Sequence, residues 1–121
     1  MLINSKIKGD WGENLIKETL KKRGWRILEE QMHSRFGEID IIALDKDEIV
    51  FIEVKTRGEG SWGDPFEFVN KLKRKKILKT ARLYLLKKGW ENKPYRFDVA
   101  SVMVNEKGSA KTEWFENIEM E

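Results

Sequence analysis

An α/β fold, with a strand pair buried between two layers, is the prediction for this chain of 121 residues. Two segments carry apolar residues at helical spacing and end in basic residues followed by glycine. Runs rich in Ile and Val, bounded by polar turns, lie between and after them. The longest run is apolar on both faces, as expected of central strands. The predicted order of elements is α-β-β-β-α-β-β.

The first helix is expected directly after Gly9 and Asp10, and Gly24 supplies its stop. Its apolar residues recur at helical spacing: Trp11, Leu15, Ile16 and Leu20. Residues 25–32 are predicted to form a strand with an exposed end. Residues 36–56 are predicted to form two strands around the polar turn 45–48.

A second helix is expected after a glycine-rich segment, with Asp64 as its N-cap and Pro65 in its first turn. It should continue to about Lys88. Its apolar stripe is expected to include Val69, Leu72, Ile77, Ala81, Tyr84 and Leu85. Strands 95–104 and 111–115, joined by the turn 105–109, complete the prediction.

Length and composition predict a single domain over residues 1–121, because no linker-like segment divides the chain. The absence of cysteine excludes disulfides, thiolate metal sites and cysteine nucleophiles, and it is typical of a cytoplasmic protein. No apolar run reaches membrane-spanning length. The formal net charge is only +3, so a polyanionic partner can be argued only from how the charge is distributed.

The central hairpin is predicted to bring two acids together. A tight turn centred between Lys46 and Asp47 places Asp40 opposite Glu53, on one face of the hairpin. Opposed carboxylates repel in a sheet, and a divalent cation relieves this repulsion. The predicted cofactor is therefore Mg²⁺ or Mn²⁺.

Lys55 shares the face of Glu53 and is expected to lie opposite Glu38. Its ammonium could hold or deprotonate a water molecule and offset charge on a phosphate. The alternative is a solvated hairpin face on which Lys55 merely neutralises Glu38. Glu13 stacks with the inward residues of the first helix, but, taken alone, a first-turn acid favoured by the helix dipole is the more common explanation.

The stretches GEIDIIA (37–43) and FIEVKTR (51–57) together resemble the PD-(D/E)XK nuclease signature. More narrowly, the chain resembles the YraN-like family of bacterial proteins, which are similar to Holliday-junction resolvases. Three further motifs match in order: GDWGE (9–13), residues 73–85 and RFDV (96–99). Gln31 and His33 stand where the family usually has Asn and Arg, so their roles stay open.

The resemblance implies a restriction endonuclease-like αβββαβ core, with a mixed central sheet flanked by helices. It implies that Asp40, Glu53 and the backbone carbonyl of Val54 bind the metal. Glu13 would assist them, and Lys55 would be catalytic together with the two acids. Because related resolvases act as dimers, a homodimer is expected by analogy.

The second helix is strongly basic, with no acid between Phe68 and Trp90. It could follow the phosphate backbone of a nucleic acid, here expected to be DNA, through residues including Lys71, Lys73, Arg74 and Lys76. A merely solvated helix face is the equally weighted alternative. Trp62 is expected to anchor its loop, His33 to lie at the surface, and Asp98 to be a hydrogen-bonded structural acid.

These patterns favour a metal-dependent endonuclease that hydrolyses DNA phosphodiester bonds, with branched or repair intermediates as substrates. The alternative is a nucleic-acid-binding or assembly module that keeps the nuclease fold with little or no activity of its own.

Overall fold

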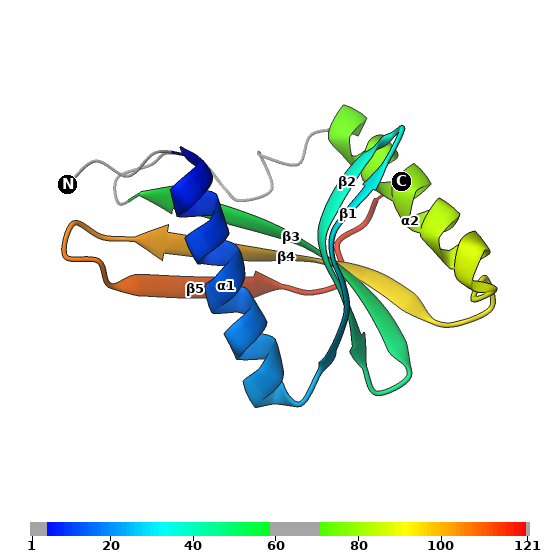
Figure 1. Cartoon of the computed structure of the whole chain (residues 1–121), viewed down its shortest axis with the longest axis horizontal. Helices are drawn as coiled ribbons and strands as arrows, with labels where there is room; N and C mark the ends of the chain where they lie inside the picture. The colour runs from blue at the N-terminus through cyan, green and yellow to red at the C-terminus, as the bar shows by residue number, and fades with distance from the viewer. Residues whose placement is uncertain (1–4, 59–70, 121) are drawn as a thin grey trace.

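The computed structural model describes residues 5–58 and 71–120, with side chains from residue 9 onward. Within these residues, a five-stranded sheet is flanked by two helices (Figure 1). The elements are α1 (Ser5–Arg23), β1 (Arg26–Ser34), β2 (Gly37–Asp45), β3 (Glu48–Gly58), α2 (Lys71–Lys88), β4 (Tyr95–Val104) and β5 (Ala110–Phe115). The predicted order of elements is confirmed. Neither helix is long and apolar enough, over the part described, to cross a membrane.

The sheet is mixed, with the strand order β1-β2-β3-β4-β5. Only β3 and β4 run parallel, and α2 lies between them in the chain, so it provides the crossover that a parallel pair requires. The other neighbouring strands are antiparallel. This architecture is consistent with a restriction endonuclease-like core and confirms the predicted fold class.

Two apolar clusters cover the two faces of the sheet. Phe51 and Ile49 of β3 pack in the cluster that contains the buried residues of α2. Val50 and Ile52, which alternate with them, pack in the cluster that contains Ile16 and Leu20 of α1. The strong apolar character of β3 therefore follows from its burial on both faces.

The central hairpin has the predicted register only near its turn. Asp45 pairs with Glu48 across a two-residue turn, and the ladder continues to Ile41 and Ile52. Beyond that point β3 follows β4, whereas β2 follows β1, and Figure 1 shows the two pairs diverging. We call this point the fork.

The fork contradicts the predicted pairing of Glu38 with Lys55. Glu38 instead pairs with His33 of β1, and its carboxylate lies 3.0 Å from the His33 ring nitrogen Nδ1. Both side chains are largely exposed. The prediction was wrong because it extended the β2–β3 ladder past the place where twisted strands exchange partners.

Helix α1 begins at Ser5, earlier than predicted, so Gly9 and Asp10 lie inside it. A glycine within a helix costs only about 1 kcal/mol, which explains why it did not mark the helix start. The buried stripe of α1 runs through Gly12, Ile16 and Leu20. Trp11 is offset from this stripe and is 40% exposed, so its predicted place among the apolar residues of the stripe was wrong.

Helix α2 buries Ile77, Thr80, Ala81, Tyr84 and Leu85. The prediction that Leu72 belongs to this stripe was wrong, since its side chain is 64% exposed. Lys73, four residues before Ile77, continues the inward-facing side instead. The predictions for Trp62, Asp64, Pro65 and Val69 fall outside the described residues.

Gly12 sets how closely α1 can approach β3. A Cβ atom at this position would lie 1.7 Å from Oγ1 and 3.0 Å from Cβ of Thr56. We expect Gly12→Ala to lower the free energy of unfolding by about 1–3 kcal/mol, because the helix must move off the strand. Urea unfolding of the metal-free protein measures this.

Gly9→Ala is the matched control in the same helix, because nothing lies within 4 Å of a Cβ atom built there. It should leave stability unchanged or raise it by up to about 1 kcal/mol through helix propensity. Equal effects of the two substitutions would show that helix propensity, and not contact with Thr56, dominates at Gly12.

Candidate metal and phosphate site

Asp40 lies at the fork and joins the two diverging strands. Its Oδ2 accepts a hydrogen bond of 2.8 Å from the backbone N–H of Val54, and only 8% of the residue is exposed. The predicted proximity of Asp40 to the segment 53–55 of β3 is therefore confirmed. The hydrogen bond between Asp40 and Val54 makes this contact just after the β2–β3 ladder has ended at its last pair, Ile41 and Ile52.

The backbone of β2 changes its alternation at Asp40. Ile42 and Ile39 both pack in the cluster on the α2 side, whereas Ile41 packs in the cluster on the α1 side. Strict alternation would have placed Ile39 with Ile41. At this break the carboxyl group of Asp40 comes close enough to that of Glu13 of α1 for each to shift the pKa of the other, so Glu13 belongs to the cluster.

Gln31 of β1 completes this side of the site, a role that the sequence left open. It lies between Glu30 and Met32, which pair with residues flanking Asp40, and its amide nitrogen donates a hydrogen bond to Oε2 of Glu13. Its φ is +51°, a backbone conformation that Asn tolerates better than other side chains. Because the family usually has Asn at this position, the positive φ could have been predicted from that preference.

Glu53 of β3 supplies the second acid, and its side chain is 11% exposed. Its Oε1 lies 3.7 Å from the ammonium of Lys55 and 2.9 Å from that of Lys73. Lys73 therefore enters the site from α2, although the sequence suggested a role for it on the outer, nucleic-acid-binding face. Its position four residues before buried Ile77 was the signal that could have placed it.

The electrostatics of the cluster follow from burial and close charges. Burial, followed by the charge of Glu53, raises the pKa of Asp40 to about 8, against the opposing hydrogen bond from Val54. Burial likewise raises the pKa of Glu13. Burial, then Lys73, lowers the pKa of Lys55. For Lys73, burial is the largest single effect and would lower the pKa, but the interactions with Glu53, Lys55 and Asp40 together outweigh it and the pKa is raised.

The donor atoms fit a hard divalent cation. Asp40 and Glu53 are neighbouring carboxylates whose repulsion a dication would relieve, and the Val54 carbonyl is a third oxygen on the same segment. Over residues 9–58 and 71–120, no three His, Cys, Asp or Glu side chains are arranged to hold an ion together. Mg²⁺ is commonly bound through one or two carboxylates, with water and substrate oxygens completing its shell. The ligand role of Glu13 thus remains a prediction.

Asp40 should make the metal-free protein less stable as the pH rises. Because its folded pKa is about 8 against 3.8 for the ordinary carboxyl, the folded chain keeps a proton that the unfolded chain has lost. The free energy of unfolding therefore falls between pH 4 and 8, by at most about 1.4 kcal/mol per pH unit. Asp40→Asn should have a shallower pH dependence in urea unfolding with chelator present. Parallel curves would contradict the raised pKa.

The other predicted residues lie outside this cluster. Lys71 and Lys76 are exposed and Arg74 is half-buried, all on α2.

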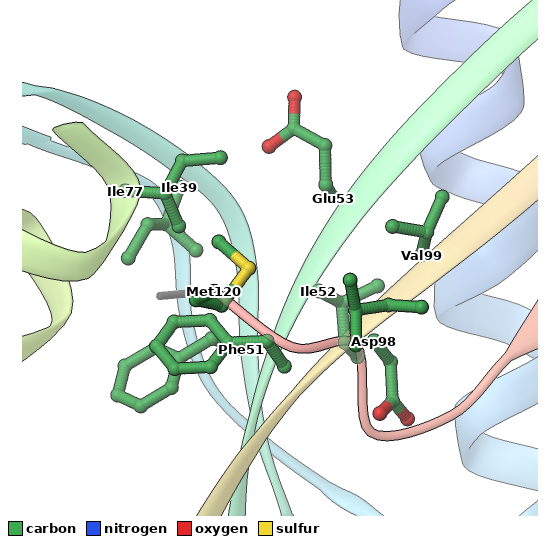
Figure 2. A pocket seen from close by; sticks show the side chains of 10 residues that line it. Ile39, Phe51, Ile52, Glu53, Ile77, Asp98, Val99 and Met120 are labelled. Atoms are coloured by element: carbon green, nitrogen blue, oxygen red, sulfur yellow. The ribbon is translucent and has the colours of Figure 1, made fainter. Parts of the chain in front are cut away.

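Asp98 is fully buried and hydrogen-bonded, as predicted, and Figure 2 shows its carboxylate pointing away from that of Glu53. Both acids line a largely apolar pocket of about 10 Å³, which has room for about one water molecule. The candidate site is therefore the charged cluster at the fork, and this pocket is too small for a nucleotide.

Comparison with known proteins places the chain in a family. Residues 12–102 match the uncharacterised protein family UPF0102, the YraN-like family. A UPF0102 protein of Persephonella marina is 48% identical over 82% of this chain and 85% of its own length. One of Clostridioides difficile is 46% identical over 87% of this chain and 92% of its own length. One of Clostridium botulinum is 50% identical over 80% of each. The chain therefore belongs to the UPF0102 family, as its motifs indicated.

Proposed function

We propose that this protein is a divalent-metal-dependent nuclease that hydrolyses phosphodiester bonds in DNA. The observation that carries the proposal is the convergence of Asp40, Glu53 and Lys55 at the fork, with Lys73 beside them. Buried acids next to partly buried ammonium groups are costly for stability alone. Titratable groups with shifted pKa values are concentrated at active sites, where they bind ions and transfer protons.

The residues divide the chemistry between them. Asp40, Glu53 and the carbonyl of Val54 would hold Mg²⁺ or Mn²⁺, which supplies a Lewis acid and lowers the pKa of bound water. Lys55, with its lowered pKa, is suited to accept a proton from the attacking water or to donate to a phosphate oxygen. Glu13, held by a hydrogen bond from Gln31, would position Asp40 from the α1 side, where the two carboxyl groups interact.

The exposed side of α2 supports a nucleic-acid substrate over a small phosphate. Most of its exposed side chains are basic: Lys71, Lys75, Lys76, Lys79, Arg82, Lys87 and Lys88. The turn that joins β1 to β2 reaches the same helix, where Ser34 and Thr80 share a hydrogen bond of 2.8 Å. A cationic helix surface of this kind can hold a phosphate backbone, with affinity that falls steeply as salt rises.

The test is cleavage of labelled branched, single-stranded and duplex DNA with Mn²⁺, Mg²⁺ or chelator. The wild-type protein should cut at least one substrate only when metal is present, and Glu53→Ala should not. Equal activity of both proteins would refute the proposal. Metal-dependent DNA binding without cleavage would favour the alternative, a binding module that has kept the nuclease fold.

A further inference from the structure

We propose that Lys73 is a second active-site cation, which pairs with Glu53 while the metal is absent and contacts the substrate phosphate once the metal is bound. This inference rests on the proposed function and extends it to a residue of α2. It assigns two successive partners to one ammonium group, and it predicts opposite effects of Lys73 on metal binding and on phosphate binding.

The position of Lys73 distinguishes it from the other basic residues of α2. It continues the helix side that carries Ile77, and its side chain is 35% exposed, whereas Lys71, Lys75 and Lys76 lie on the exposed side of the helix. Its ammonium lies 2.9 Å from Oε1 of Glu53, closer than the ammonium of Lys55 at 3.7 Å. Lys73 is therefore the nearer cation to the predicted metal ligand.

The carboxylate of Glu53 cannot bind a metal ion and keep its full ion pair with Lys73 at the same time. A metal ion bound to Glu53 would repel the nearby ammonium of Lys73, so metal binding must weaken the ion pair. The flexible four-carbon stem of a lysine allows its charged end to move by several ångströms while the backbone of α2 stays in place. The displaced ammonium could then donate a hydrogen bond to a phosphate oxygen of a substrate that is bound at the metal.

The charge balance of the cluster supports this second role. When ionised, Glu13, Asp40 and Glu53 outweigh Lys55 and Lys73 by one negative charge. A bound dication turns this into one net positive charge, which matches a phosphodiester group. Without Lys73 the metal-loaded cluster would be neutral and would lose its net attraction for the substrate anion.

The test compares Lys73→Gln with the wild-type protein and with Lys75→Gln, an exposed lysine of the same helix. Calorimetric titration with Mn²⁺ alone should show about tenfold tighter binding in Lys73→Gln, because a competing cation has been removed from Glu53. Lys75→Gln should bind Mn²⁺ like the wild type. Circular dichroism establishes that each variant is folded.

The second measurement is the affinity for a labelled oligonucleotide with phosphorothioate linkages, which resist hydrolysis. The gain in affinity on adding Mn²⁺ should be about tenfold smaller in Lys73→Gln, whereas Lys75→Gln should weaken binding equally with Mn²⁺ and with chelator. Lys73→Arg, which keeps the charge, should retain most of the gain.

The outcomes separate this inference from the proposed function. If the wild-type protein binds Mn²⁺ but Lys73→Gln binds it no more tightly, the two-partner role of Lys73 is wrong while the metal site stands. An equal loss of oligonucleotide affinity with and without Mn²⁺ would also refute it, since Lys73 would then act as an ordinary surface cation. If Mn²⁺ does not bind the wild-type protein, the metal site and the role of Lys73 both fall.

Discussion

Lys55→Met is expected to reduce metal-dependent DNA cleavage by about a hundredfold to a thousandfold while the protein still binds Mn²⁺. The reason is that Lys55 contributes charge and a proton-transfer group but no ligand atom to the ion. Its ammonium lies 3.7 Å from Glu53, and its pKa is lowered by burial and by Lys73. Cleavage rates at saturating Mn²⁺, with calorimetry on the same samples, measure the two properties separately.

Lys55→Arg distinguishes the two chemical roles of this lysine. The guanidinium stays protonated under all these conditions. If Lys55 acts only through its positive charge, Arg should restore part of the activity. If it accepts a proton from water, Arg should be as inactive as Met. Lys93→Met, an exposed lysine in the segment between α2 and β4, is the control and should cut DNA normally. Full activity of Lys55→Met would contradict the assignment.

The part of the site that the sequence predicted depends on local geometry. A two-residue turn and side-chain alternation determine which residues of β2 and β3 face each other as far as Ile41 and Ile52. This was enough to predict that Asp40 lies near the segment of β3 that carries Glu53, although the alternation breaks at Asp40 itself. The same rule failed at Glu38, because β2 leaves β3 after Ile41 and continues with β1. Where the β2–β3 ladder ends depends on the pairing of β2 with β1 and of β3 with β4. The sequence of the hairpin alone does not predict where those other strands take over.

The cluster also gains residues from elements far away in the chain. Lys73 contacts Glu53 from 20 positions away, and its orientation depends on the rotation of α2 about its axis. Including Leu72 in the apolar stripe rotated the predicted helix slightly and turned Lys73 outward. Gln31 was missed for a different reason, since its role depends on a positive φ within a strand. Residue type alone predicts such a conformation for Gly or Asn, and rarely for Gln.

Asp98→Ala is expected to lower the free energy of unfolding by about 3–5 kcal/mol, because it breaks a buried ion pair and removes the shared acceptor of several donors. Asp98 accepts hydrogen bonds from the indole N–H of Trp114 at 2.9 Å, the backbone N–H of Asn117 at 3.0 Å and Nε of Arg96 at 3.1 Å. The side chain of Arg96 is 10% exposed and also contacts Glu48 in the β2–β3 hairpin. Urea unfolding of the metal-free protein measures the loss.

Glu116→Ala is the matched control, because this acid also approaches Arg96, at 3.8 Å, but is 64% exposed. An exposed pair of this kind contributes at most about 1 kcal/mol. A large difference between the two variants would show that the acid of the RFDV motif stabilises the fold: through Arg96 it ties β4 to the hairpin that carries Asp40 and Glu53. If Asp98→Ala instead abolished cleavage with no loss of stability, Asp98 would have to act in the reaction, which its orientation away from Glu53 opposes.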